Sequence, residues 1–197
     1  MKILKIKKKK NKVIYNYNLE TIKRVTEEYK DLSRNPNLNI GLTIALEDED
    51  NIFEWIATLI GAKDSSYRGG LFYLKVIFPN DYPNRRPLIK FLTPIYHANV
   101  YLKRYKYIEL GYIDLSTLNN WRPDFTMRKV FLDIFVLINY CGNQDCFISD
   151  IITKEMRNNR ELYEEKKRYF TKKYANPLIN HRNKYSKLDE WDFTYDK

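Results

Sequence analysis

The sequence predicts an α+β domain, a four-stranded antiparallel meander preceded by an N-terminal helix and followed by C-terminal helices. Three observations predict it. Apolar residues recur at helical spacing after residue 18, four strand-like runs then follow one another with turn residues between them, and helical spacing returns after Pro123. Strands in succession, with helices before and after, are typical of this fold class.

The first element is a helix over residues 19–33. Asn18 is a suitable N-cap, because its side-chain oxygen can accept a hydrogen bond from a backbone N–H of the first turn, and Glu20 suits the positive end of the helix. The sequence Asn-Pro-Asn at 35–37 ends it. Its apolar face, at helical spacing, consists of Leu19, Ile22, Val25, Tyr29 and Leu32.

Four strand-like runs follow. The first two alternate apolar residues with others, and the third is nearly all apolar and aromatic, which are strand patterns. The connections carry residues that favour turns. The runs cover residues 40–46, 53–59, 71–78 and 88–92, and the connections cover 47–51, 61–70 and 79–87.

After Pro123 the sequence predicts three helices. The first has the apolar stripe of a buried helix, and residues 142–145 break it. Ser149 suits the N-cap of a short second helix that includes Met156. The stripe is Val130, Phe131, Ile134, Leu137 and Ile138, and the third helix places Leu162, Tyr169, Phe170 and Tyr174 inward with Glu164, Lys166, Lys167 and Lys172 outward.

The chain of 197 residues suits one domain with tails. We expect a basic arm over 1–17, the domain over 18–175 and a C-terminal tail over 176–197. Residues 1–12 hold seven lysines and no acid, so most of the net charge of +10 belongs to the arm. Nucleic-acid binding is therefore not expected of the domain, only of the arm. The acidic and aromatic tail is a disordered end, a strap on the domain or a docking peptide.

Several classes are excluded by composition. The two cysteines are too few for a disulfide framework, and no apolar signal core follows the N-terminus. The longest apolar run, 130–141, is interrupted by Asp133 and Asn139, so no membrane span is expected. We expect a reducing compartment, cytosol or nucleus. There is no phosphate-binding loop and no metal-ligand spacing, so we expect no cofactor and no metal.

Motifs then occur in a fixed order. They read Tyr67-Arg68-Gly69-Gly70-Leu71-Phe72, then Phe78-Pro79-Asn80-Asp81-Tyr82-Pro83, then His97-Ala98-Asn99, then Gly111-Tyr112-Ile113-Asp114-Leu115, then Trp121-Arg122-Pro123. Together they resemble the ubiquitin-conjugating enzymes, which carry Tyr-x-Gly-Gly-x-Phe, Phe-Pro-x-x-Tyr-Pro, His-Pro-Asn, Gly-x-Ile-Cys-Leu, a Trp and a Pro. The resemblance covers about residues 19–175 and implies the same fold.

The resemblance implies a catalytic cysteine at position 114, where this chain has Asp114. In the family that cysteine receives ubiquitin from an activating enzyme as a thioester and passes it to a lysine. Thiol exchange is close to thermoneutral, whereas a carboxylate would have to form a mixed anhydride. Asp114 is therefore not expected to be a nucleophile. Shifting the alignment by one places Ile113 or Leu115 there, and neither restores a cysteine.

Other departures agree with this interpretation. Ala98 replaces the proline of the family, and the 100–110 segment is longer, forming a surface hairpin, a block on the site or a contact surface. Asn84 stands where family members carry a bulky apolar residue for ligase docking. The resemblance implies that Asn99 supports the site loop or polarises the thioester carbonyl. With Asp114 present we expect a structural role for Asn99, and for His97 a loop role rather than that of a general base.

Cys146 is the observation that favours retained activity. It lies in a segment, residues 141–146, that resembles the Pro-Asn-x-x-Asp segment bordering the family's catalytic cysteine. It is either a nucleophile moved across the cleft or a small, half-buried loop residue. Cys141 is expected in the core.

We therefore expect a ubiquitin-conjugating-enzyme-like protein without the usual catalysis, acting by binding ubiquitin, a ubiquitin-like protein or a partner conjugating enzyme. One alternative is an active conjugating enzyme that uses Cys146. The other is an interaction scaffold that uses the 100–110 insert and the tails. Whether the chain is an enzyme stays open at this point. The resemblance implies an activating enzyme and a ligase as further partners.

Overall fold

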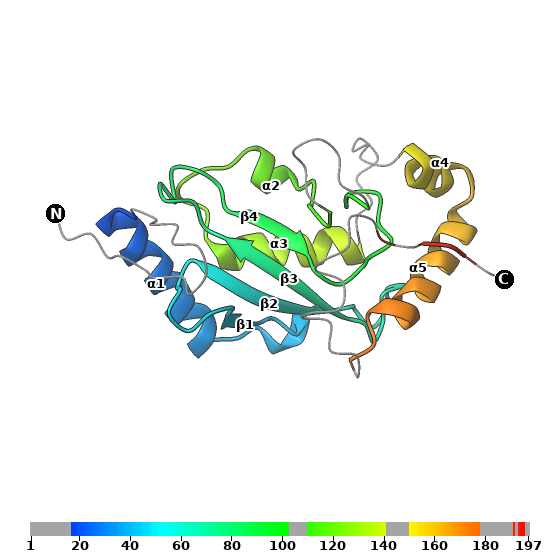
Figure 1. The fold of residues 1–197 in the computed structure, drawn as a ribbon. Helices are drawn as coiled ribbons and strands as arrows, with labels where there is room; N and C mark the ends of the chain where they lie inside the picture. Colours follow the sequence, from blue (N-terminus) through cyan, green and yellow to red (C-terminus); the bar gives the residue numbers. More distant parts are fainter. Residues whose placement is uncertain (1–16, 103–109, 141–149, 178–190, 192, 196–197) are drawn as a thin grey trace.

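The computed structural model describes residues 17–102, 110–140, 150–177, 191 and 193–195. Figure 1 shows their arrangement as an N-terminal helix, a sheet and C-terminal helices. The elements are α1 (Leu19–Arg34), the 3₁₀ turn η1 (Leu38–Ile40), β1 (Thr43–Leu46), β2 (Glu54–Ile60), β3 (Leu71–Ile77), β4 (Leu88–Phe91), α2 (Ser116–Asn119), α3 (Met127–Asn139), α4 (Asp150–Asn158) and α5 (Arg160–Tyr174).

The sheet is the predicted antiparallel meander, with strand order β1-β2-β3-β4. The register pairs Ala57 of β2 with Leu74 of β3, and Leu74 with Phe91 of β4. Because side chains alternate between the two faces of a strand, these three residues share one face. All three are buried, so this face is the core face. The α+β prediction is confirmed.

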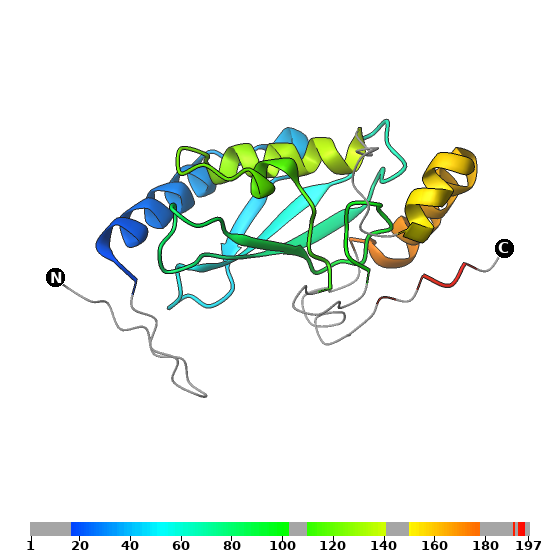
Figure 2. The same cartoon turned by 90° about the horizontal axis from the view of Figure 1, so that it is seen from above.

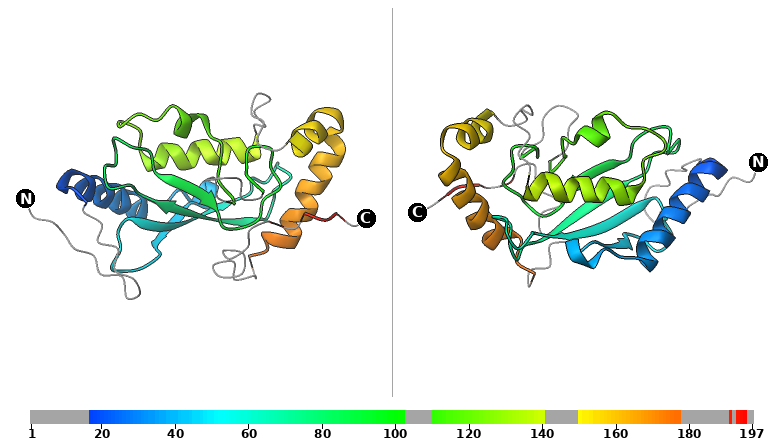
Figure 3. Two further views of the ribbon diagram at one scale, coloured as in Figure 1. Left: turned by 45° about the horizontal axis from the view of Figure 1, so that its top comes forward. Right: turned by 180° about the vertical axis from the view of Figure 1, so that it is seen from behind.

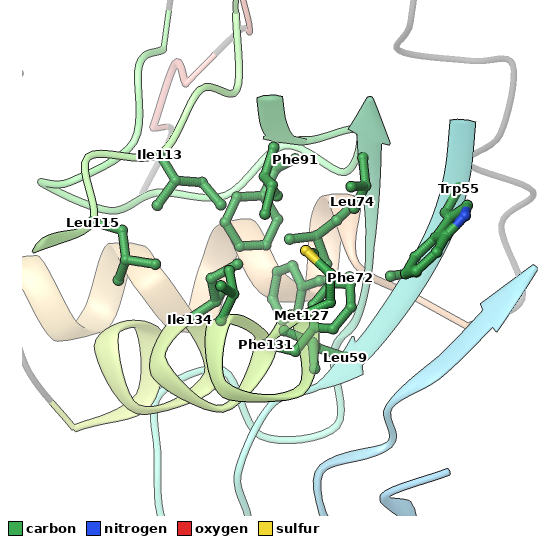
Figure 4. Close-up of a cluster of buried hydrophobic side chains, with 14 of the residues drawn as sticks. Trp55, Leu59, Phe72, Leu74, Phe91, Ile113, Leu115, Met127, Phe131 and Ile134 are labelled. Atoms are coloured by element: carbon green, nitrogen blue, oxygen red, sulfur yellow. The ribbon is translucent and has the colours of Figure 1, made fainter. Parts of the chain in front are cut away.

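α3 covers the core face of the sheet, as Figure 2 shows. In Figure 4 the side chains of Met127, Phe131 and Ile134 point from α3 toward Phe72, Leu74 and Phe91 of the sheet. All of them are at most 1% exposed. The predicted stripe of α3 is therefore the centre of the core, and removing any one of these side chains would leave a cavity.

α1 begins and ends where its capping residues predict. The Asn18 side chain accepts a hydrogen bond from the Thr21 N–H at 2.7 Å, and the helix ends at Asn35. Val25 and Leu32 are buried as predicted, but Leu19 is 68% exposed. The prediction for Leu19 was wrong because the first turn of the helix extends beyond the sheet (Figure 2).

A buried carboxylate on α1, which the apolar pattern did not indicate, joins three parts of the fold. Glu28 is 8% exposed and accepts hydrogen bonds from the Tyr82 hydroxyl, the Arg24 guanidinium and the Met127 backbone N–H. Tyr82 lies in the loop before β4, and Met127 begins α3. Glu28 therefore fixes α1 against both.

The first predicted strand begins later than expected. Residues 38–40 form a 3₁₀ turn that ends at Gly41 in the left-handed region, with φ of 61°. Ile40 therefore precedes the strand, although it is buried. The alternating pattern included Ile40 because this residue is apolar and buried, but it contributes to the core from the turn that precedes β1.

α4 and α5 lie at the end of the sheet opposite α1, which the two views of Figure 3 both show. The buried residues of α5 include Tyr163, Lys167, Phe170 and Tyr174. One prediction was therefore wrong, since Lys167 is buried and not outward, while Leu162 and Tyr169, which were predicted inward, are half-buried. Lys167 is tolerated inside because its ammonium group pairs with Glu164 at 3.0 Å and lies 4.6 Å from the centre of the Tyr67 ring.

Candidate functional site

The candidate site is built on residues 96–99, which are all buried. The Tyr67 hydroxyl donates a hydrogen bond to the Tyr96 carbonyl at 2.7 Å, and the Tyr96 hydroxyl donates to Glu155 of α4 at 3.0 Å. Tyr67 belongs to the segment before β3 that carries the Tyr-x-Gly-Gly-x-Phe pattern. That pattern and the His97-Ala98-Asn99 motif are therefore parts of one hydrogen-bonded unit.

His97 is 1% exposed, and its Nδ1 accepts a hydrogen bond from the Asn99 backbone N–H at 3.0 Å. Burial is the main cause that lowers the pKa of His97 to about 3, and the charge of Lys167 adds to it. The ring is therefore neutral near pH 7, with its Nδ1 occupied by the loop itself. This geometry supports a loop-bracing role and offers no free base to a substrate.

Asn99 is the residue that joins this loop to position 114. Its carbonyl accepts a hydrogen bond from the Asp114 backbone N–H at 2.9 Å, and an isolated β-bridge pairs Val100 with Ile113. The Asn99 side chain is buried, and its Oδ1 has no hydrogen-bond partner among the described residues. Leaving a buried acceptor unpaired costs about 1–3 kcal/mol.

Asp114 lies between two buried anchors. Ile113 and Leu115 are 0% and 5% exposed, and Figure 4 shows them in the buried cluster beside Phe91 and Ile134. Side chains alternate in extended backbone, so Asp114 is turned away from the core. Its side chain is accordingly half-buried at the surface.

The carboxylate of Asp114 is part of a short hydrogen-bonded chain. The Asn119 side-chain amide donates to Asp114 Oδ1, and the Asn119 Oδ1 accepts from the Arg86 guanidinium at 3.1 Å. Arg86 also donates to the Leu118 carbonyl at 3.0 Å. Sequence reasoning did not identify this chain, because Arg86 lies in the loop before β4 and Asn119 at the end of α2.

The structure brings together three of the four predicted site residues, namely His97, Asn99 and Asp114. Cys146 lies outside the described residues, as do Cys141 and residues 103–109 of the predicted insert. The displaced-nucleophile hypothesis therefore stays a hypothesis. Among the described residues, no group of His, Cys, Asp and Glu side chains is arranged to hold a metal ion.

The loop that follows Tyr82 is polar at its tip. Asn84 and Arg85 are exposed, and Arg85 pairs with Asp81 at 2.8 Å. Behind the tip, Trp121 Nε1 donates a hydrogen bond to the Pro83 carbonyl at 2.7 Å. This hydrogen bond joins the two loops. The exposed side chains at the tip are polar, whereas the family pattern has a bulky apolar residue there for ligase docking.

None of the described helices is long and apolar enough to cross a membrane.

At position 114 the geometry provides a carboxylate that accepts a hydrogen bond, with a braced loop beside it. Transfer of an acyl group from a thioester onto this carboxylate would form a mixed anhydride, which is uphill.

A protein-family comparison agrees with this architecture. The family model described as ubiquitin-conjugating enzyme matches residues 24–171, which is more than half of the chain and includes the sheet, residues 96–99, Asp114 and most of α5. The chain belongs to the ubiquitin-conjugating enzyme family.

Proposed function

We propose that this member of the family acts without thioester chemistry, by holding ubiquitin, a ubiquitin-like protein or a partner conjugating enzyme noncovalently. The observation that carries the proposal is the Asp114 carboxylate, which stands where the family pattern has its cysteine and accepts a hydrogen bond from Asn119. A thiolate is the nucleophile that the family's acyl exchange requires.

The physical argument concerns the stability of the product. A thioester that meets a thiol gives another thioester, so the exchange is close to balanced. A thioester that meets a carboxylate gives a mixed anhydride, which is far less stable. The hydrogen bond from Asn119 stabilises the free carboxylate and so makes attack by Asp114 still less favourable.

The rest of the domain is retained in a form suited to binding. The residues that surround position 114 are well packed, since Ile113, Leu115 and Asn99 are buried. Apolar side chains also remain exposed on α3 and at its C-cap. Leu132 and Val136 of the helix are 36% and 45% exposed, and Tyr140, the C-cap residue, is 56% exposed. Residues four apart lie on the same side of a helix, so Leu132 and Val136 share one surface. Exposed apolar surfaces of this kind support a protein partner.

The first test asks whether a covalent adduct forms. The full chain is incubated with activating enzyme, ATP and ubiquitin, and the products are separated on a gel without reductant. We expect no reductant-sensitive adduct. An adduct that the substitution Cys146→Ala abolishes, and that Cys141→Ala leaves intact, would establish the alternative of a displaced nucleophile.

The second test measures noncovalent binding. Labelled ubiquitin, or a labelled active conjugating enzyme, is titrated with the full chain and followed by NMR. We expect shifts for one of them, and we expect Val136→Asp to weaken binding at least tenfold. Leu19→Asp is the matched control, because Leu19 is an exposed apolar residue of another helix. If neither protein shifts, the binding proposal fails and the scaffold alternative gains support.

A further inference from the structure

The described end of the chain packs on the domain as an extended segment. Residues 191 and 193–195 run beside α5, as the red part of the chain shows in Figures 1 and 3. Trp191 is buried, Phe193 and Tyr195 are half-buried, and Thr194 between them is exposed. Alternate residues of an extended chain face the same side. Every second side chain of this segment is therefore an aromatic ring directed at the domain.

Trp191 attaches this segment to the backbone near the candidate site. Its N–H donates a hydrogen bond to the Leu102 carbonyl at 3.1 Å. Its ring lies so close to Gly111 that a Cβ there would be 3.0 Å from Trp191 Cη2. Gly111 lies three residues before Asp114, so the tryptophan contacts the backbone that leads into position 114.

Phe193 and Tyr195 continue the contact along α5. The Phe193 ring lies edge-on to Phe170 and Tyr96, with centroids 4.8 Å and 5.4 Å apart. The Tyr195 ring lies edge-on to Tyr169 at 5.1 Å. Edge-on geometry is the favoured arrangement of aromatic pairs. The domain residues in these contacts form a surface, called the aromatic surface below, that consists of Tyr96, Leu102, Gly111, Tyr169 and Phe170.

The sequences of the tail and of α5 carry opposite net charge. The last ten residues of the chain hold four acidic side chains and one lysine, whereas α5 holds six basic and three acidic side chains. Lys166 of α5 lies 5.7 Å from the centre of the Tyr195 ring, and the Tyr195 hydroxyl donates a hydrogen bond to Glu165. Basic residues beside aromatic rings favour an acidic segment that carries aromatic residues.

The fit of the tryptophan is imperfect in one respect. Trp191 is 4% exposed, yet its Nε1 has no hydrogen-bond acceptor among the described residues. A buried donor without an acceptor opposes docking, because in water the same N–H would be hydrogen-bonded. The described contact is made by the aromatic rings and by the hydrogen bond from the Trp191 backbone N–H to the Leu102 carbonyl.

We propose that the aromatic surface is a recognition site for acidic, extended peptide segments with aromatic residues at every second position, and that Trp191, Phe193 and Tyr195 of the chain itself occupy it in the absence of a partner. The partner is an acidic segment of another protein with the same alternation. The proposal is independent of whether position 114 carries out any chemistry. It assigns the aromatic surface a binding role and the tail the role of a built-in competitor.

The test uses the full-length protein and a fluorescent peptide of residues 187–197 as the probe, with binding followed by fluorescence anisotropy. In the wild-type chain the attached tail competes at an effective concentration on the order of millimolar, so the peptide binds weakly. In the Trp191→Ala/Phe193→Ala double variant the aromatic surface is vacated, and we expect the affinity for the peptide to be at least tenfold higher. Thr194→Ala is the matched control and should behave as the wild type.

Two further arms separate recognition from charge and from unfolding. A peptide of the same composition with its three aromatic residues adjacent should bind the double variant at least tenfold more weakly. Adding Tyr169→Ala to the double variant should abolish binding of the native peptide. Should the double variant unfold, Phe193→Ala alone takes its place, because Phe193 is only half-buried. The proposal would be overturned if a folded double variant did not bind the peptide, or if the wild type and the double variant bound the peptide equally.

Discussion

The side-chain amide of Asn119 donates a hydrogen bond to the carboxylate of Asp114, and its oxygen in turn accepts one from Arg86. The residue at position 114 is thus integrated into the surface that surrounds it. The backbone on either side is fixed independently, by the buried side chains of Ile113 and Leu115 and by the hydrogen bond from the Asp114 N–H to the Asn99 carbonyl. The backbone at position 114 therefore does not depend on the carboxylate.

This independence predicts a gain of function. Asp114→Cys is expected to form a reductant-sensitive adduct when incubated with activating enzyme, ATP and ubiquitin, at a rate at least tenfold above that of the wild type. The reason is that the substitution supplies the thiol while the backbone around it stays in place. The measurement is a time course on gels without reductant.

Asp114→Ala is the control for this experiment, since it removes the carboxylate without adding sulfur. The adduct of Asp114→Cys should also survive the additional change Cys146→Ala. A folded Asp114→Cys protein that forms no adduct would mean that the chain has lost more than its nucleophile, most simply its contact with the activating enzyme.

We expect the loss of the Glu28 carboxylate to lower the stability of the domain strongly. Glu28→Ala leaves the Tyr82 hydroxyl and the Met127 N–H without their acceptor and Arg24 without its partner. Removing one member of such a buried network is expected to lower the free energy of unfolding by about 3–5 kcal/mol. Urea unfolding followed by circular dichroism measures the change.

The neighbouring residue provides the matched control for Glu28. Glu27 has a side chain that is 60% exposed, and it pairs with Lys23 at 4.0 Å. Exposed pairs four residues apart on a helix contribute about 0.3–0.5 kcal/mol, so Glu27→Ala should change stability by no more than that. Equal effects of the two substitutions would contradict the role assigned to Glu28.

The sequence was most informative where the determinants are local. Asn18 caps α1 through an amide three residues away, and the strand runs alternate over a few residues, so both were predictable. The motifs also located His97, Asn99 and Asp114 in one site, because they carry a resemblance to a whole family. That part rested on the pattern of the family and not on the physics of single residues.

The remainder depended on contacts between distant residues. Lys167 was placed outward because a charged side chain is normally exposed, but Glu164 and the rings of Tyr67 and Tyr163 compensate its burial. Arg86 reaches Asn119 across 33 residues, a pairing that no local pattern encodes. Such pairings become visible only once the loops are placed in space.

Gly111 predicts a backbone requirement just before the candidate site. Its φ is +80°, and a Cβ at this position would lie 2.2 Å from the Phe91 carbonyl oxygen. The same two residues are joined by a hydrogen bond from the Phe91 N–H to the Gly111 carbonyl. Gly111→Ala should therefore force β4 and the segment leading to Asp114 apart, and we expect a loss of about 3 kcal/mol or more in unfolding free energy.

Gly69→Ala separates the two causes of this loss. Gly69 has a similar φ of +76°, but a Cβ there would meet nothing within 4 Å. Only the cost of a left-handed conformation, roughly 1–2 kcal/mol, should then appear. The difference between the two variants in thermal or urea unfolding measures the clash, and a Gly111→Ala variant no less stable than Gly69→Ala would exclude it.

His97 predicts how stability depends on pH. Its pKa is lowered to about 3 in the folded protein, mainly by burial and then by the charge of Lys167, whereas an unfolded histidine titrates near 6.5. Between these two values the unfolded chain binds a proton that the folded chain excludes. Stability is therefore complete above about pH 6.5 and decreases as the pH falls below it, by roughly 1 kcal/mol for each pH unit.

His97→Asn keeps a side-chain oxygen that can accept the Asn99 N–H but cannot be protonated in this range. We expect the variant to be less stable than the wild type at pH 7.5, yet to show a flatter dependence of unfolding free energy between pH 7 and pH 5. Urea unfolding at half-unit steps of pH measures both slopes. The sequence contains a second histidine, His181, and His181→Asn is the matched control. If His97→Asn retains the wild-type slope while His181→Asn loses it, the pH dependence does not come from the buried ring.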